Sequence, residues 1–199
     1  MSQPRAQHSI DEIARVAQWN GRIQPGRDWK SVEQEIGTTL PDDYKELLNR
    51  FPSGSYRNAI TVSNPVDSRT DYAKFIREDI HGTLEILGDE GLEYIEDTGY
   101  RTFPELGGLL PWGHDGQGGM FCWITEPADP NQWRVAYYSQ GLGEWREHSG
   151  PMTDVIWKVL TGTGDDNIFR WDLAHELAIF RVPSTLLANG EWLPYAEYR

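Results

Sequence analysis

The feature that most constrains the fold is a series of three short strand-like segments between residues 120 and 148. They run from Met120 to Thr125, from Trp133 to Tyr138 and from Glu144 to His148. Turn-forming sequences join them, at Pro127 to Pro130 and at Gly141 to Gly143. Connections this short join antiparallel neighbours, because parallel strands need a crossover of about a dozen residues or more. This half of the chain therefore predicts a meander of antiparallel strands.

The segments before the meander follow helical periodicity. Ser9 and Glu12 have the spacing of a capping box, Asp28 offers a second N-cap, and Gly37 a helix stop. Pro41 is predicted to be the first residue of a third helix. Apolar residues follow these three starts at helical spacing: Ile13, Val16 and Ala17; Trp29, Val32 and Ile36; Tyr44, Leu47, Leu48 and Phe51.

Together with the remaining elements, these segments predict an α+β fold, in which N-terminal helices pack on a mostly antiparallel sheet and a helix follows at the C-terminal end. Ala59 to Val62 predicts a short strand. Residues 71–81 predict a helix whose inward positions are Tyr72, Phe75, Ile76 and Ile80. The C-terminal helix begins at Pro151 and buries Val155, Ile156, Val159 and Leu160. We expect residues 1–164 to form one domain and residues 165–199 an extension packed on it.

The charge of the chain limits its partners. Its 199 residues contain 31 Asp and Glu against 18 Lys and Arg, a net charge of −13, without a cluster of basic residues. Such a chain is not expected to bind nucleic acid directly. The N-terminus lacks the apolar run of a secretory signal, and no stretch approaches 18 apolar residues. We therefore expect a cytoplasmic protein that does not enter a membrane.

Several residues could carry chemistry, but a structural role is the simpler interpretation of each. His114-Asp115, in a glycine-rich loop, could be a catalytic dyad or a phosphate cradle, yet the P-loop pattern is missing and a hairpin or bulge turn is predicted. His175-Glu176 begins like a zinc-protease helix, but residue 179 is isoleucine, so a solvated helix face is predicted. The single cysteine, Cys122, is predicted to be a buried thiol. We expect no catalytic residues, no metal and no cofactor.

Six of the nine tryptophans fall on inward-facing or strand positions and are predicted to pack in the core, with a carbohydrate-stacking platform as the alternative: Trp29, Trp112, Trp123, Trp133, Trp145 and Trp157.

Two ordered motifs resemble those of the SUKH superfamily, which includes the fungal cell-wall-assembly regulator and many bacterial immunity proteins. The residues of the first motif are Trp29, Val32, Glu33, Ile36, Gly37, Leu40, Pro41, Tyr44, Leu47 and Leu48. Those of the second are Phe103, Pro104, Gly108, Leu109, Leu110, Pro111, Trp112, Gly113, Gly118, Trp123, Asp129, Pro130 and Trp133. Together the motifs cover about residues 25–162.

The resemblance implies a SUKH-like fold and a non-enzymatic role. The bacterial members are typically immunity proteins that bind and neutralise a cognate toxin, often a nuclease or a nucleic-acid deaminase. The motif residues look structural: Gly37 at a helix stop, Pro41 at a helix start, and Trp112-Gly113 at a turn into the sheet. They mark the fold and do not locate a toxin-binding surface.

An acidic stretch supplies the candidate toxin-binding surface. Between Glu85 and Glu105 there are seven acids against one base, Arg101. A toxin that cleaves nucleic acid carries a basic substrate groove, which an acidic inhibitor can occupy. The predicted contact residues are the acids at the centre of the stretch: Asp89, Glu90, Glu93, Glu96 and Asp97. A merely solvated acidic helix is the alternative interpretation.

Two other functions remain open at this point. One is a regulatory or scaffold module that binds an endogenous partner, as the resemblance to the fungal regulator allows. The other is an enzyme, for instance a hydrolase that uses His114 and Asp115.

Overall fold

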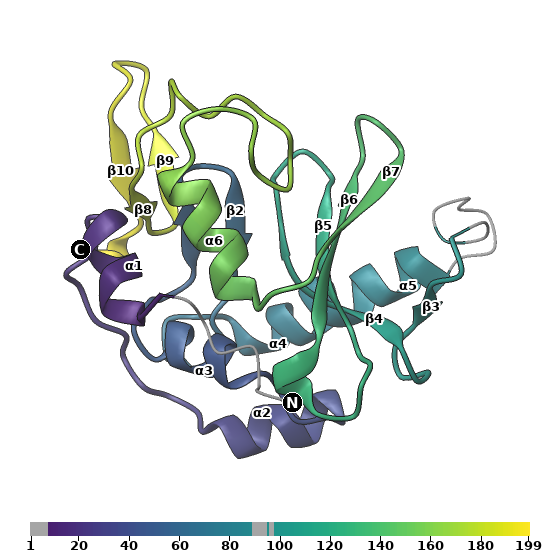
Figure 1. Ribbon diagram of the computed structural model, residues 1–199. Coiled ribbons are helices and arrows are strands. Elements are labelled where there is room, and N and C mark those ends of the chain that lie inside the picture. The colour runs from purple at the N-terminus through teal and green to yellow at the C-terminus, as the bar shows by residue number, and fades with distance from the viewer. Residues whose placement is uncertain (1–7, 89–94, 96–97) are drawn as a thin grey trace.

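The computed structural model describes residues 8–88, 95 and 98–199, and its centre is one mixed but mostly antiparallel sheet (Figure 1). The strand order is β7-β6-β5-β4-β2-β1-β8, and β3 pairs in parallel with β4. The strands are β1 (Gly54–Tyr56), β2 (Ile60–Val62), β3 (Arg101–Thr102), β4 (Gly108–His114), β5 (Met120–Ile124), β6 (Arg134–Ser139), β7 (Glu144–His148) and β8 (Phe180–Arg181). With the helices described below, this confirms the α+β class.

The predicted meander is confirmed as β5, β6 and β7, with bounds within one residue of those expected. All five residues of β5 are buried. A strand that is covered on both faces has an unbroken apolar sequence rather than an alternating one, which explains the run from Met120 to Ile124. Strand β1 was not predicted, because Ser53-Gly54 suggests only the end of a helix.

Four helices lie against one face of the sheet or at its end: α1 (Ile10–Val16), α2 (Trp29–Ile36), α3 (Asp42–Leu48) and α6 (Met152–Thr161). Their predicted caps are confirmed. The Ser9 hydroxyl accepts from the backbone N–H of Glu12, and the Asp28 carboxylate accepts from that of Ser31 at 2.8 Å. Gly37 ends α2 with a φ of +92°, where a side chain would be strained. The position of Pro41 was wrong by one residue: its ψ of 141° is extended, so it is the N-cap and Asp42 begins the helix.

The helix predicted for residues 71–81 is longer and changes its winding. It comprises α4 (Tyr72–Lys74), a π-helical segment η1 (Phe75–Gly82) and α5 (Thr83–Gly88). A π-helical turn hydrogen-bonds residues five apart, so Phe75 and Ile80 come to the same face, and both are buried. The helix predicted from the sequence is therefore confirmed, with a π-helical middle that the sequence did not indicate.

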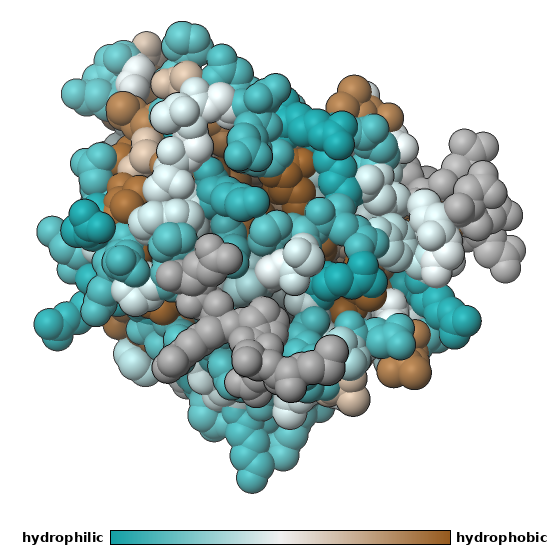
Figure 2. All heavy atoms as spheres, viewed as in Figure 1, coloured by the Kyte–Doolittle hydropathy of each residue, from teal (hydrophilic) through white to brown (hydrophobic). Residues whose placement is uncertain are grey.

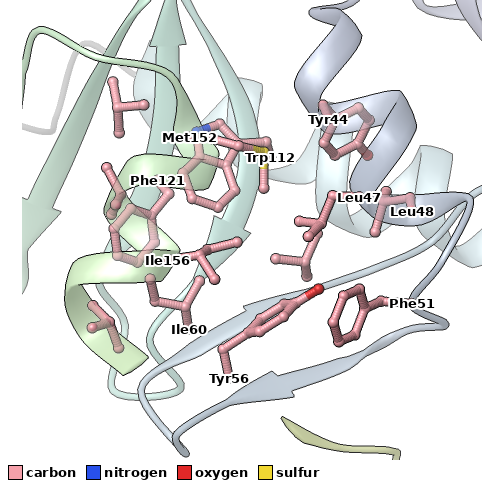
Figure 3. Close-up of a cluster of buried hydrophobic side chains, with 14 of the residues drawn as sticks. Tyr44, Leu47, Leu48, Phe51, Tyr56, Ile60, Trp112, Phe121, Met152 and Ile156 are labelled. Atoms are coloured by element: carbon pink, nitrogen blue, oxygen red, sulfur yellow. The ribbon is translucent and has the colours of Figure 1, made fainter. Parts of the chain in front are cut away.

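The buried side chains form two clusters on the two faces of the sheet. The larger cluster lies between the sheet and α1, α3 and α6, and includes Phe121, Trp123 and Tyr137 from the central strands. The smaller cluster lies on the other face and joins Leu87 of α5 to Leu109, Met120, Cys122 and Tyr138 among others. Figure 3 shows Trp112, Phe121 and Ile156 of the larger cluster near one another, and Tyr56 beside Phe51.

Tyr56 contributes an unpaired hydroxyl to this core. Its side chain is fully buried, and its hydroxyl finds no hydrogen-bond partner among the described residues. A buried polar group without a partner loses its hydration and gains nothing in return. We expect Tyr56→Phe to raise the free energy of unfolding by about 1 kcal/mol, measured by chemical denaturation. A loss of stability in Tyr56→Phe would show that the hydroxyl has a partner.

The segment after α6 packs against the first hairpin of the sheet. Phe169 and Leu173 are buried, and β8 pairs with β1 through Phe180 opposite Tyr56. A separate hairpin of β9 (Ser184–Leu186) and β10 (Trp192–Pro194) follows, and short 3-10 turns cover Pro130–Gln132 and Ala196–Tyr198. Figure 2 shows hydrophobic patches over the C-terminal strands and at the β6–β7 turn, on a surface that is otherwise mostly hydrophilic.

Arg57 holds this segment in place. The side chain is 6% exposed and donates hydrogen bonds to five backbone carbonyls. Three of them, those of Val159, Leu160 and Gly162, lie at the C-terminal end of α6, and two belong to Leu173 and Glu176. The guanidinium thus caps a helix whose last carbonyls lack partners within the helix.

In the part of the chain that the structure describes, no helix combines the length and the hydrophobicity required to cross a bilayer.

Candidate functional groove

A row of side chains crosses the sheet on the face opposite α1, α3 and α6. The registers place Arg181 opposite Ser55, Ser55 opposite Thr61, and Thr61 opposite His114. Directly opposed residues in antiparallel strands project to the same face. The row therefore joins β8, β1, β2 and β4, and it continues into the buried Met120 of β5.

An irregularity in β4 brings His114 into this row. The pairing of β4 with β5 shifts between Pro111 and Gly113, which leaves Trp112 as the extra residue of a bulge. Regular alternation from Leu110 would turn His114 toward the core, whereas the extra residue turns it to the opposite face. Gly113 is needed at this point, because a Cβ there would lie 2.8 Å from the carbonyl oxygen of Thr61.

A cavity of about 470 Å³ lies beside the row, between the helix of residues 72–88 and strand β4. Its apolar walls include Phe75, Ile86, Pro111 and Met120. Polar groups come from Thr61, Ser63, Thr83, His114 and Gln140, and backbone from the glycine-rich loop between β4 and β5. Two acids, Glu78 and Asp79, line the cavity, and its described lining contains no lysine or arginine.

A second cavity, of about 250 Å³, lies at the other end of the row. It is lined by Arg181 and by Trp192 of β10, and the Arg181 guanidinium lies 5.2 Å from the centre of the Trp192 ring. The two cavities share Thr61 and Ser63 in their walls. We call the row and the two cavities together the sheet-face groove.

The two acids of the larger cavity differ in their surroundings. Glu78 is exposed and lies 3.7 Å from the Lys74 ammonium and 3.0 Å from the Arg77 guanidinium. Asp79 is half-buried and forms no ion pair with any residue of the described chain. Burial, and then the charge of Asp79, raise the pKa of the Tyr44 hydroxyl.

His114 and Asp115 do not form the dyad that was considered from the sequence. The Asp115 carboxylate accepts from the backbone N–H groups of Gln117 and Gly119 and from the Tyr137 hydroxyl at 2.8 Å. The His114 Nδ1 accepts from the N–H of Gly116 at 3.1 Å. Asp115 thus shapes the turn between β4 and β5. Burial and the hydrogen bond to Asp115 raise the pKa of the Tyr137 hydroxyl, which keeps this proton in place.

The other chemical candidates lie outside the groove. Cys122 is fully buried in β5, and burial raises the pKa of its thiol. His175-Glu176 lies in an exposed turn, so the predicted helix face was wrong; Arg57 holds the Glu176 carbonyl in that turn. Within residues 8–88, 95 and 98–199, no cluster of His, Cys, Asp and Glu is suited to hold a metal ion.

The five predicted toxin-binding acids lie outside the described residues: Asp89, Glu90, Glu93, Glu96 and Asp97. In sequence they follow directly after Gly88, the last residue of the helix that walls the larger cavity.

The first SUKH-like motif joins α2 to α3. The Trp29 indole donates to the Asn49 side chain at 2.9 Å, and the Glu33 carboxylate accepts from the backbone N–H of Leu40 and from the Lys45 ammonium. Leu40 and Tyr44 are buried.

The second motif lies partly in the groove. Pro111, Trp112 and Gly113 belong to β4, so the predicted place of Trp112-Gly113 at a turn into the sheet was wrong. All three line the larger cavity, as does Gly118, which has a φ of +92°. Trp123 is buried beside Trp112.

Four residues that line the larger cavity were not predicted from the sequence: Thr61, Ser63, Asp79 and Thr83. The alternation of apolar and polar residues from Ile60 to Ser63 could have indicated Thr61 and Ser63, since Ile60 and Val62 face the core.

The chain thus has an α+β fold in which one sheet face carries the core helices and the other carries the sheet-face groove. A family model described as SMI1-KNR4 cell-wall, of the SUKH group, matches residues 27–150. This is well over half of the chain, so the chain belongs to the SUKH superfamily. No curated protein and no solved structure matches it.

Proposed function

We propose that this protein is an immunity protein that binds a nucleic-acid-targeting toxin and neutralises it stoichiometrically. The observation that carries the proposal is the acidic character of the larger cavity of the sheet-face groove, on a chain with a net charge of −13. Membership of the SUKH superfamily supports a binding role of this kind.

The electrostatics favour a basic protein partner. A toxin that acts on nucleic acid must present positive charge to its substrate, and an acidic inhibitor is steered to the same surface. Such steering raises association rates by about 10-fold to 1,000-fold and weakens with salt. The five acids from Asp89 to Asp97 follow the wall helix in sequence, and we propose that they extend the contact surface.

The alternative of a hydrolase finds no support at the candidate dyad. Both oxygens of the Asp115 carboxylate are engaged by the turn and by Tyr137, and the Nδ1 of His114 accepts rather than donates. A His–Asp dyad requires that the imidazole donate to the carboxylate.

Co-expression tests the proposal. We expect the chain to restore growth of cells that produce the toxin encoded immediately upstream of its gene, and to leave cells that produce an unrelated toxin unprotected. Absence of protection at full expression of the soluble chain would contradict the proposal. A gene without a toxin-encoding neighbour would instead favour the regulatory module with an endogenous partner.

A further inference from the structure

Asp79 is a half-buried carboxylate in a cavity that supplies it with no counter-ion. It projects from η1, and no lysine or arginine is among the described residues that line the cavity. Its neighbour Glu78 is already matched by Lys74 and Arg77. Salt and water screen a partly buried charge less than a surface charge, so it attracts a cation more strongly.

The rest of the cavity suits a long side chain with an apolar stem. Phe75, Ile86 and Met120 offer apolar walls on the way to Asp79. Lysine and arginine pack their methylene groups on such surfaces while the charged head reaches a polar group. The volume of about 470 Å³ exceeds that of one side chain and leaves room for the main chain that carries it.

The lining also supplies hydroxyl groups, from Thr61, Ser63 and Thr83. A peptide segment offers both a cation for Asp79 and backbone groups that pair with such hydroxyls.

We propose that the cavity between the helix of residues 72–88 and strand β4 takes a lysine or arginine side chain of the partner protein, with Asp79 as its counter-ion. The inference deepens the proposed function and rests on it for the identity of the partner. The chemistry of the cavity can be tested without the partner.

The first experiment uses a small probe on the full chain. N-acetyl-arginine amide is titrated against N-acetyl-citrulline amide, a neutral molecule of nearly the same shape, and amide and indole shifts are followed by NMR. We expect the arginine probe to shift the signals of Thr83, Gly119 and the Trp112 indole, and to bind about tenfold more tightly than the citrulline probe. Equal binding of the two probes would overturn the inference.

Substitutions at Asp79 test whether this carboxylate is the group that binds the arginine probe. We expect Asp79→Asn to weaken binding of the arginine probe about tenfold. Asp79→Glu keeps the charge and is expected to weaken this binding less than threefold. Glu46→Gln removes the same charge from an exposed position on α3, and we expect it to leave the affinity for the arginine probe unchanged. Arginine binding that is unchanged in Asp79→Asn would also overturn the inference.

The partner protein separates this inference from the proposed function. If the chain binds the upstream gene's product and Asp79→Asn leaves that affinity unchanged, the inference fails and the proposed function stands. If the chain distinguishes arginine from citrulline but does not bind that product, the inference stands and the proposed function fails.

Discussion

Replacing Arg57 with methionine is expected to lower the free energy of unfolding by about 3 kcal/mol or more, measured by chemical denaturation. The change removes five hydrogen bonds and leaves buried carbonyls at the end of α6 and at Leu173 without donors. An unsatisfied buried polar group costs about 1–3 kcal/mol, and water can reach only some of these carbonyls.

Two further variants make the result specific. Lysine has three donors on one nitrogen and cannot span the carbonyls that the planar guanidinium reaches, so Arg57→Lys is expected to lose about half as much stability. Arg15→Met removes an exposed arginine of α1 and is expected to change stability by less than about 0.5 kcal/mol. A loss in Arg57→Met no larger than that in Arg15→Met would contradict the role of the guanidinium.

Reversing the five acids Asp89, Glu90, Glu93, Glu96 and Asp97 to lysine is expected to weaken toxin binding about 100-fold at low salt. Each exposed charge pair contributes about 0.2–1 kcal/mol, and reversal replaces attraction with repulsion. Because exposed charges are screened within a Debye length of about 10 Å at 0.1 M salt, the difference should shrink strongly at high salt. Isothermal titration calorimetry at two ionic strengths measures both effects.

The control reverses the same number of exposed acids outside the predicted surface and the groove: Glu46, Asp165, Glu176, Glu191 and Glu197. This variant has the same net charge, so it isolates the position of the charges from their sum. We expect it to lose less than a tenth of the binding free energy that the first variant loses. Equal losses in the two variants would reject the assignment of these five acids, although not the immunity role.

Local signals predicted much of the fold. The caps at Ser9 and Asp28, the stop at Gly37 and the turns around the meander each act within a few residues, so the sequence is enough to find them. The strand β1 and its pairing with β8 depend instead on residues more than a hundred positions apart. Nothing near Ser55 indicates that Phe180 and Arg181 will lie beside it.

The groove could not be predicted from the sequence because it, too, depends on how segments pack in the folded chain. His114 faces the groove only because a bulge at Trp112 changes the alternation of β4, and Asp79 faces the cavity from a π-helical segment. The hydrogen bonds from Arg57 to the end of α6 were also not predicted, since a lone arginine in a hairpin turn ordinarily indicates a solvated side chain. In each case the tertiary structure overrides the local pattern.

The most direct test of the central claim is an activity titration. Purified toxin from the upstream gene is mixed with increasing amounts of the chain, and its action on nucleic acid is measured at a toxin concentration well above the dissociation constant. Stoichiometric neutralisation predicts a linear fall of toxin activity that reaches zero at one equivalent of the chain. Toxin activity that is unchanged in the presence of excess folded chain would contradict it.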